Sequence, residues 1–216
     1  MTPDELRQRW AERSGEFSPD YYAHYGPDET SEAIRRCIER TTEAESDLSI
    51  LELGCSSGRH LVHLHDHGYE DLHGIDVNEE AMTVMRQAYP ELAAAGTFYI
   101  DTIENAVQEF DDDAFDVVYS METLQHIHPD NEWVFDELAR ITADRLLTVE
   151  IEGPSEESAN SQRGETETPE VNYVDDAVPL YYRAWNRTFA ARGLTEVTSE
   201  RLGNDTLRLF RWSENA

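Results

Sequence analysis

A short apolar run that ends in an acidic residue and turns on two glycines is the stretch of this chain best suited to hold a ligand. It reads Ile-Leu-Glu-Leu-Gly-Cys-Ser-Ser-Gly-Arg-His over residues 50–60. Gly54 and Gly58 allow a tight turn and a close approach of the backbone to a ligand, and the helical pattern that follows would direct free N–H groups at that ligand. The spacing matches neither the Gly-x-Gly-x-x-Gly dinucleotide fingerprint nor the P-loop. The turn therefore predicts a nucleotide-like cofactor without a pyrophosphate, although a plain strand-to-helix turn would show the same glycines.

Two further acidic residues close later apolar runs. Asp76 ends the next run, near the separation of about 20 residues at which dinucleotide folds place the carboxylate that binds ribose hydroxyls. Asp101 ends the run after that. Either residue could instead be a simple helix cap, because short acidic side chains accept hydrogen bonds from the first N–H groups of a helix.

In this order, the segments resemble the motifs of class I S-adenosylmethionine-dependent methyltransferases. Residues 51–58 are similar to motif I, with Ser56 at the usual middle glycine, residues 72–77 to motif II, residues 99–103 to the end of the third strand and residues 115–121 to motif IV. The resemblance covers about residues 48–150 and implies S-adenosyl-L-methionine as the cofactor. It implies that Asp76 holds the ribose, that Val77 packs on the adenine and that Asp101 meets the adenine amino group. The cofactor-binding residues expected from it are Glu52, Gly54, Cys55, Gly58, Asp76, Val77, Asp101, Thr102, Ser120 and Met121.

Residues for the acceptor side of such a site come from two other places. His126 follows the motif IV strand, and its imidazole could take a proton from an attacking hydroxyl or amine at neutral pH. Tyr21, Tyr22 and Tyr25 could cover the sulfonium by cation–π attraction. In both cases the alternative is a packing role, with the histidine under its loop and the tyrosines holding the amino-terminal arm to the body.

Three histidines at helical spacing could be the ligands of a metal ion. His60, His63 and His67 fall on one helix face, beside an apolar stripe that the helix can bury. A zinc site would need a fourth partner, and the sequence shows none. We therefore expect no metal site.

Composition restricts the possible partners and surroundings. The formal charge is −29, from 46 acidic and 17 basic residues, and all 17 are arginine. Concentrated salt screens such self-repulsion, so the composition is similar to that of halophilic archaeal proteins. The negative field argues against nucleic-acid binding, and the lack of lysine excludes Schiff-base chemistry. No apolar run approaches the ~18 residues that span a membrane, and with two cysteines and no signal-peptide pattern we expect a cytoplasmic protein with free thiols.

Strand and helix patterns alternate along most of the chain, which indicates βαβ units and a parallel sheet. The predicted strands cover residues 48–53, 72–77, 97–100, 115–120 and 145–151, and the predicted helices 31–40, 57–67, 79–88, 103–109, 131–142 and 178–192. A hairpin over 194–200 and 205–212, turning at Gly203-Asn204, would close the sheet. We expect an α/β, doubly wound, Rossmann-like fold: a seven-stranded mixed sheet, last strand antiparallel, with helices on both faces.

A length of 216 residues suits a single domain. Within it we expect an N-terminal arm and helix over residues 1–45, a cofactor-binding core over 46–151 and a C-terminal helix and hairpin over 178–216. Residues 152–177, rich in Gly, Pro, Ser and Glu, would be an insertion, either a lid over the site or an inert loop.

The function predicted on this basis is methyl transfer from S-adenosylmethionine to a small-molecule acceptor. Positioning of the acceptor supplies most of the acceleration in such a reaction, so no elaborate triad is required. A nicotinamide oxidoreductase would share the architecture but needs the missing fingerprint. A non-catalytic adenosine-cofactor-binding or scaffold protein stays open, because no residue identifies the acceptor. The oligomeric state is left open as well.

Overall fold

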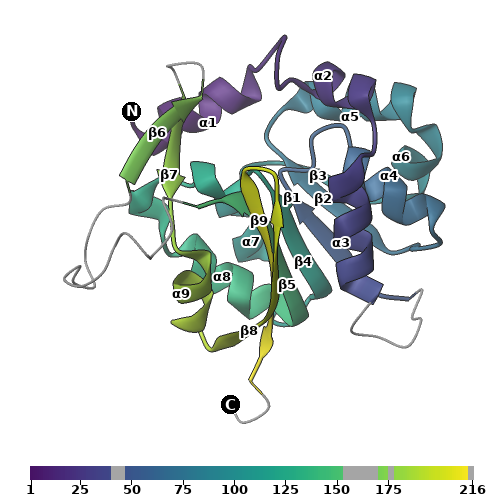
Figure 1. The fold of residues 1–216 in the computed structure, drawn as a ribbon. Helices are drawn as coiled ribbons and strands as arrows, with labels where there is room; N and C mark the ends of the chain where they lie inside the picture. The colour runs from purple at the N-terminus through teal and green to yellow at the C-terminus, as the bar shows by residue number, and fades with distance from the viewer. Residues whose placement is uncertain (40–46, 153–169, 175–177, 214–216) are drawn as a thin grey trace.

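The computed structural model describes residues 1–39, 47–152, 170–174 and 178–213 of the chain. Its strands form one large sheet and one small one, shown in Figure 1. The strands are β1 (Ile50–Leu53), β2 (Leu72–Asp76), β3 (Thr97–Ile100), β4 (Phe115–Met121), β5 (Thr142–Ile151), β6 (Glu170–Val174), β7 (Val178–Tyr182), β8 (Leu194–Leu202) and β9 (Asp205–Trp212).

The helices lie mostly between these strands in sequence. They are α1 (Pro3–Ala11), α2 (Pro19–Tyr25), α3 (Glu29–Glu39), α4 (Arg59–Asp66), α5 (Glu79–Ala88), α6 (Pro90–Ala95), α7 (Ile103–Glu109), α8 (Val134–Ile141) and α9 (Trp185–Ala190), with 3-10 turns η1 (Leu124–His126) and η2 (Pro129–Asn131). In the part of the chain that the structure describes, no helix has the length and apolar character needed to cross a membrane.

The large sheet has seven strands in the order β3-β2-β1-β4-β5-β9-β8. Strands β1 to β5 run parallel, and β9 lies antiparallel between β5 and β8. This confirms the predicted mixed sheet and the predicted hairpin. The strand order reverses between β1 and β4, which are neighbours. In open α/β sheets the crevice outside the carboxyl ends of the strands at this reversal is where ligands bind.

Helices cover both faces of the sheet, as Figure 1 shows. Alternate residues of each strand point to opposite faces. In β1, Ile50 packs with α3, α4, α5 and α6, while Leu51 and Leu53 pack with α7, α8 and α9. The two cores fix β1 and β4 from both sides, so the turns after these strands are held on a rigid base.

The first 30 residues, expected as a turn-rich arm, contain two helices. Thr2 accepts a hydrogen bond from the Glu5 N–H and the Glu5 carboxylate accepts one from the Thr2 N–H, so a capping box starts α1. Ser18 accepts a hydrogen bond from the Tyr21 N–H, with Pro19 in the first turn of α2. These local signals fix where both helices begin, and residues of both helices line the cavity at the carboxyl ends of the strands.

The predicted helix over residues 178–192 was wrong in its first part. Val178–Tyr182 is strand β7, paired antiparallel with β6, and the helix begins only at Trp185. The branched residue Val178 and the aromatic residues Tyr181 and Tyr182 favour a strand here. Val178 and Tyr181 bury their side chains against Leu6 of α1, so tertiary packing holds the strand in place.

Most of the predicted insertion, residues 153–169 and 175–177, lies outside the described residues. Its role as a lid stays a prediction.

Candidate functional site

A cavity of about 1140 Å³, counted with its open mouth, lies outside the carboxyl ends of β1, β2 and β4. We divide its lining into two walls. The strand-end wall follows the strands and consists of Glu52, Gly54, Cys55, Ser56, Arg59, His60, Ile75, Asp76, Val77, Asn78, Asp101, Thr102, Ile103, Glu104, Met121, Glu122 and Thr123. The outer wall consists of residues of α1, α2 and the connection between them, together with three residues after β4: Pro3, Leu6, Arg7, Trp10, Arg13, Phe17, Pro19, Tyr22, His126, Ile127 and His128.

The turn after β1 can form only with glycine at its first position. Gly54 has φ +70°, and a Cβ there would overlap the side-chain hydroxyl of Thr123. Ser56, at the position of the missing middle glycine, also has a positive φ, +48°. Gly58 has φ +81° and starts α4, but a Cβ on it would meet Met85 and Leu92 at 2.9 Å. Gly58 thus serves helix packing and does not line the cavity.

Asp76 links the turns that follow β1 and β2. One of its carboxylate oxygens accepts the Ser56 N–H at 2.8 Å, and the other accepts the Asn78 N–H at 2.8 Å. Desolvation raises the pKa of Asp76, and these backbone hydrogen bonds oppose the rise. The carboxylate lines the cavity, as predicted for a ribose ligand, and each oxygen has a second lone pair to offer.

Glu52 is a buried carboxylate with an unused oxygen. Its side chain is 2% exposed, and its Oε2 has no hydrogen-bond partner among the described residues. Burial raises the pKa of Glu52 to about 8, and the hydroxyl of Tyr119, which lies opposite Glu52 in the β1–β4 register, opposes the rise. This contact is not a hydrogen bond of normal geometry, since neither the Tyr119 hydroxyl nor Glu52 Oε2 forms one among the described residues. A buried, unpaired oxygen on a cavity wall costs free energy unless a ligand pairs with it.

Asp101 and Thr102 form the rim of the strand-end wall. The Asp101 carboxylate is exposed and accepts the Thr102 N–H at 2.7 Å and the Asn105 side-chain amide at 3.0 Å. Thr102 caps α7, since its hydroxyl accepts the Asn105 N–H at 3.1 Å. The cap of α7 is therefore Thr102 and not Asp101, and both residues line the cavity.

Ser120 does not line the cavity, which departs from the predicted cofactor contact. It is fully buried, and its hydroxyl donates to Glu150 at 2.7 Å. Glu150, which the sequence analysis missed, also accepts the N–H groups of Thr123, Leu124 and Gln125 at 3.0–3.1 Å. Glu150 thereby fixes the loop that carries His126.

His126 lies in the outer wall with one defined tautomer. Its Nδ1 is 3.0 Å from the carbonyl oxygen of Pro179. A carbonyl only accepts, so Nδ1 carries the proton and Nε2 holds the lone pair. Desolvation lowers the pKa of His126 to about 4, against the effect of the Pro179 bond, so the ring is neutral at pH 7. Its ring lies 4.7 Å from that of Trp10.

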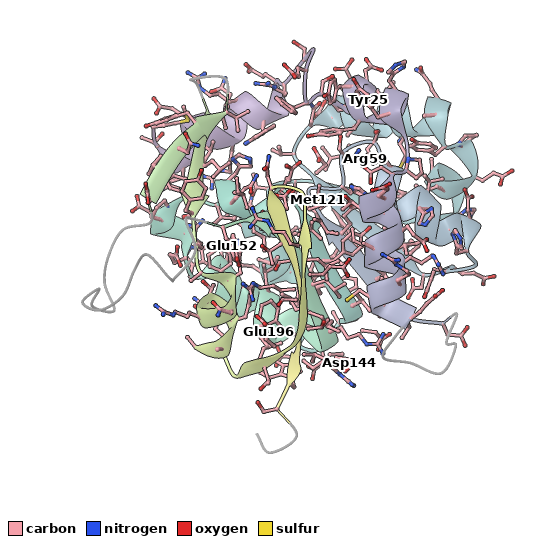
Figure 2. The ribbon with its side chains drawn as sticks, in the orientation of Figure 1. Tyr25, Arg59, Met121, Asp144, Glu152 and Glu196 are labelled. Carbon is pink, nitrogen blue, oxygen red and sulfur yellow. The ribbon has the colours of Figure 1, made fainter. Side chains whose placement is uncertain are left out.

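Only one of the three predicted tyrosines lines the cavity. Tyr22 does so, with the Arg59 guanidinium 4.9 Å above its ring. Tyr25 is 63% exposed at the outer surface of α2, and Tyr21 packs against it at 4.8 Å, outside the lining. Figure 2 shows Tyr25 at the surface and Arg59 and Met121 below it, toward the sheet.

The sequence analysis missed the arginines and the tryptophan of this cavity. Arg13 lies over the rings of Trp10 and Phe17, at 5.8 and 5.3 Å. Asn78, at the turn after β2, donates to the Arg13 carbonyl at 3.2 Å and so joins the two walls. The capping-box pattern at Thr2–Glu5 could have located α1, but no local pattern predicts what its side chains meet.

Comparison with known proteins agrees with this geometry. Residues 50–145 match the family described as "Methyltransferase domain", and a search of curated proteins finds no match. A Burkholderia thailandensis 1,6-didemethyltoxoflavin-N1-methyltransferase is similar in structure, with a TM-score of 0.68, 16% identity and coverage of 99% of this chain and 92% of that one. The magnesium protoporphyrin IX methyltransferase of Synechocystis PCC 6803 has a TM-score of 0.61, 15% identity and coverage of 98% and 92%. A Mesorhizobium loti S-adenosylmethionine-dependent methyltransferase has a TM-score of 0.62, 15% identity and coverage of 90% and 100%.

These findings place the fold among Rossmann-like methyltransferases, and residues 50–145 are the part of the chain that is similar to a methyltransferase domain. The matched domain implies S-adenosylmethionine as the cofactor.

Proposed function

We propose that the protein transfers a methyl group from S-adenosylmethionine to a small-molecule acceptor. The observation that carries the proposal is the buried, unpartnered Glu52 oxygen on the same wall as the Gly54 turn and the Asp76 carboxylate. The cofactor offers an ammonium group, a ribose diol and an adenine ring. A buried carboxyl group that ionises beside a cation suits the ammonium, a carboxylate acceptor suits the diol, and a backbone without a Cβ allows close approach.

The residues present fit this cofactor. Asp76 would accept hydrogen bonds from the ribose hydroxyls, Asp101 would meet the adenine amino group, and Glu52 would pair with the ammonium. The bound cofactor supplies an electrophilic methyl group on a sulfonium. The chain's task is to hold that group against the acceptor and to exclude water.

The outer wall would hold the acceptor. The rings of Trp10, Phe17 and Tyr22 offer flat apolar faces, and the similar structures named for ring-shaped substrates support a small molecule there. The unprotonated Nε2 of His126 would accept the proton that a hydroxyl or amine loses on methylation. Its low pKa makes His126 a weak base in the free protein, so it would take the proton only as the hydroxyl or amine becomes strongly acidic on bonding to the methyl group.

The test of the proposed function is calorimetry with S-adenosylhomocysteine, followed by incubation with labelled S-adenosylmethionine and a panel of ring-shaped hydroxyl and amine compounds. We expect saturable binding at one site and label transfer to at least one class of acceptor. Failure to bind would refute the assignment. Tight binding without transfer to any acceptor would favour the non-catalytic cofactor-binding protein.

We also propose that the protein works in concentrated salt. The net charge of −29 repels itself wherever screening is weak. Thermal melts from low to molar potassium chloride should show a rising melting temperature, and a flat profile would contradict the proposal.

A further inference from the structure

A group of possible metal ligands lies away from the cavity, where α3 packs beside α4. One ring nitrogen of His63, one of His67 and one carboxylate oxygen of Glu32 all lie within 4.8 Å of one another. It is the one group of three or more His, Cys, Asp or Glu with this closeness in the described part of the chain. We propose that these three residues bind a divalent transition-metal ion of the Zn²⁺ type.

The distances and orientations suit such an ion. His63 Nε2 lies 3.0 Å from Glu32 Oε2, and two ligands of a tetrahedral zinc ion are separated by about 3.3 Å. His67 Nδ1 lies 2.7 Å from the His63 carbonyl oxygen. Since the carbonyl accepts, Nδ1 carries the proton, and Nε2 of His67 has the lone pair that a metal requires. A backbone carbonyl that orients a ligating histidine in this way is a common support of metal sites.

The ligand set differs from the one that helical spacing suggested. His60 is buried, and its Nδ1 lies 2.8 Å from the Ser31 hydroxyl, so it faces the core side of α3. The partner that the α4 histidines lack comes from α3, as Glu32. Two imidazoles and one carboxylate form the mixed nitrogen and oxygen set that Zn²⁺ accepts, with the remaining position open to water.

A metal ion bound to Glu32 would share this carboxylate with the guanidinium of Arg35. The guanidinium bonds both carboxylate oxygens, at 2.7 and 2.9 Å. A carboxylate only accepts, so in the metal-free protein His63 donates to Glu32 from Nε2, and a bound ion would replace that proton. Each oxygen has more than one lone pair, so Arg35 orients the carboxylate but weakens the site by its charge.

The proposed ion would fasten α3 to α4. The two helices are already joined by the Arg59–Asp28 ion pair at 3.1 Å and by the His60–Ser31 bond. None of the three proposed ligands lines the cavity, whereas Arg59, the first residue of α4, does. The site would therefore stabilise the base of the strand-end wall without touching a ligand there.

The test is titration of the full-length protein with ZnCl₂, by calorimetry and by melting temperature, with MgCl₂ as the comparison. We expect one Zn²⁺ per chain, a raised melting temperature and no matching effect of Mg²⁺, because imidazole is a poor Mg²⁺ ligand. Loss of a supporting partner costs a metal site about 10–100-fold in affinity, so loss of a ligand in His67→Ala should cost at least as much. His67 is exposed, and the variant should keep the parent's melting temperature without metal.

His65→Ala is the matched control, because His65 lies on the same helix outside the group and should leave Zn²⁺ affinity unchanged. Arg35→Gln should tighten Zn²⁺ binding. The proposal fails if Zn²⁺ binds no better than Mg²⁺, or if His65→Ala weakens binding as much as His67→Ala, since either result would mean diffuse attraction to the acidic surface.

Discussion

The two walls of the cavity differ in what determines their shape. The strand-end wall depends on backbone conformation, with positive φ angles at Gly54, Ser56 and Glu122 in the turns after β1 and β4. The outer wall depends on side chains brought from distant parts of the chain, such as the Trp10 ring against the His126 ring. The first wall lies largely inside the segment that matches the methyltransferase domain, and much of the second lies outside it.

Because of this difference, we expect the two walls to tolerate amino-acid substitutions to different degrees. A backbone turn held by two neighbouring strands has few alternative conformations, so a single added carbon atom can block the cavity beside it. A wall of stacked rings and guanidinium groups can repack around a new side chain at modest cost. We expect cofactor affinity to respond strongly to changes in the strand-end wall and weakly to changes in the outer wall.

The largest effect is expected for Gly54→Ala. Alanine at φ +70° is strained by about 1–2 kcal/mol, and its Cβ would overlap Thr123, whose hydroxyl is already bonded to the Met121 carbonyl at 3.0 Å. Overpacking of this kind costs about 1–3 kcal/mol more. Calorimetry should show a loss of about 100-fold or more in S-adenosylhomocysteine affinity.

Gly68→Ala is the control for Gly54→Ala. Gly68 has φ +90° with nothing within 4 Å of a Cβ, so it carries the same kind of strain without the overlap. Affinity should stay at the parent's value there. Equal losses in both variants would mean that general destabilisation, and not closure of the turn, explains the result.

The next largest effect is expected for Asp76→Ala. It would remove charge-assisted hydrogen bonds to the ribose and leave the Ser56 and Asn78 N–H groups without their acceptor, for a loss of about 1–3 kcal/mol in S-adenosylhomocysteine binding. Asp71→Ala, an exposed carboxylate at the other end of β2, serves as the control in the same calorimetric series. Unchanged affinity in Asp76→Ala would remove this residue from the binding site.

The sequence predicted the strand-end wall well because its signals are local. A glycine at a turn and an acidic residue at a strand end indicate the same local structure whatever the rest of the chain packs against. The parallel strands and the closing hairpin followed from the alternation of strands and helices. Gly58 and Ser120 are the exceptions among the predicted contacts. Gly58 packs on Met85 and Leu92, and the direction of the Ser120 hydroxyl is decided by Glu150, a residue of the neighbouring strand.

The outer wall could not be predicted in the same way. Tyr21, Tyr22 and Tyr25 have the same chemistry, and only the packing of α2 decides that Tyr22 faces the cavity. The error at Val178–Tyr182 has a similar origin, since that segment pairs with β6 and packs on α1, far away in sequence.

A smaller, pH-dependent effect should arise at Glu52. Its pKa of about 8 means that it holds a proton at pH 6 in the free protein. An ammonium group beside it favours the ionised form, so binding releases the proton, and S-adenosylmethionine affinity should rise about tenfold between pH 6 and 7. Methylthioadenosine, which lacks the amino-acid portion, should bind with a flat profile, as should S-adenosylmethionine to Glu52→Gln. A parallel rise for both ligands would assign the titration to another group.

The smallest effect is expected in the outer wall, by hydrogen exchange. S-adenosylhomocysteine should slow exchange most in the turn at residues 54–58, because Gly54, Cys55 and Ser56 line the cavity and a bound ligand would hold their backbone in place. Residues 17–25 should slow by less than about tenfold, because this segment lines the cavity through side chains such as Phe17 and Tyr22, and helix ends open locally at low cost. Addition of an acceptor should slow residues 17–25 further and leave residues 54–58 as they were, because closure of the outer wall excludes water only when both ligands are present. If the acceptor slows neither α2 nor residues 126–128, the outer wall does not close over it, and acceptor contacts must be sought in residues 152–177.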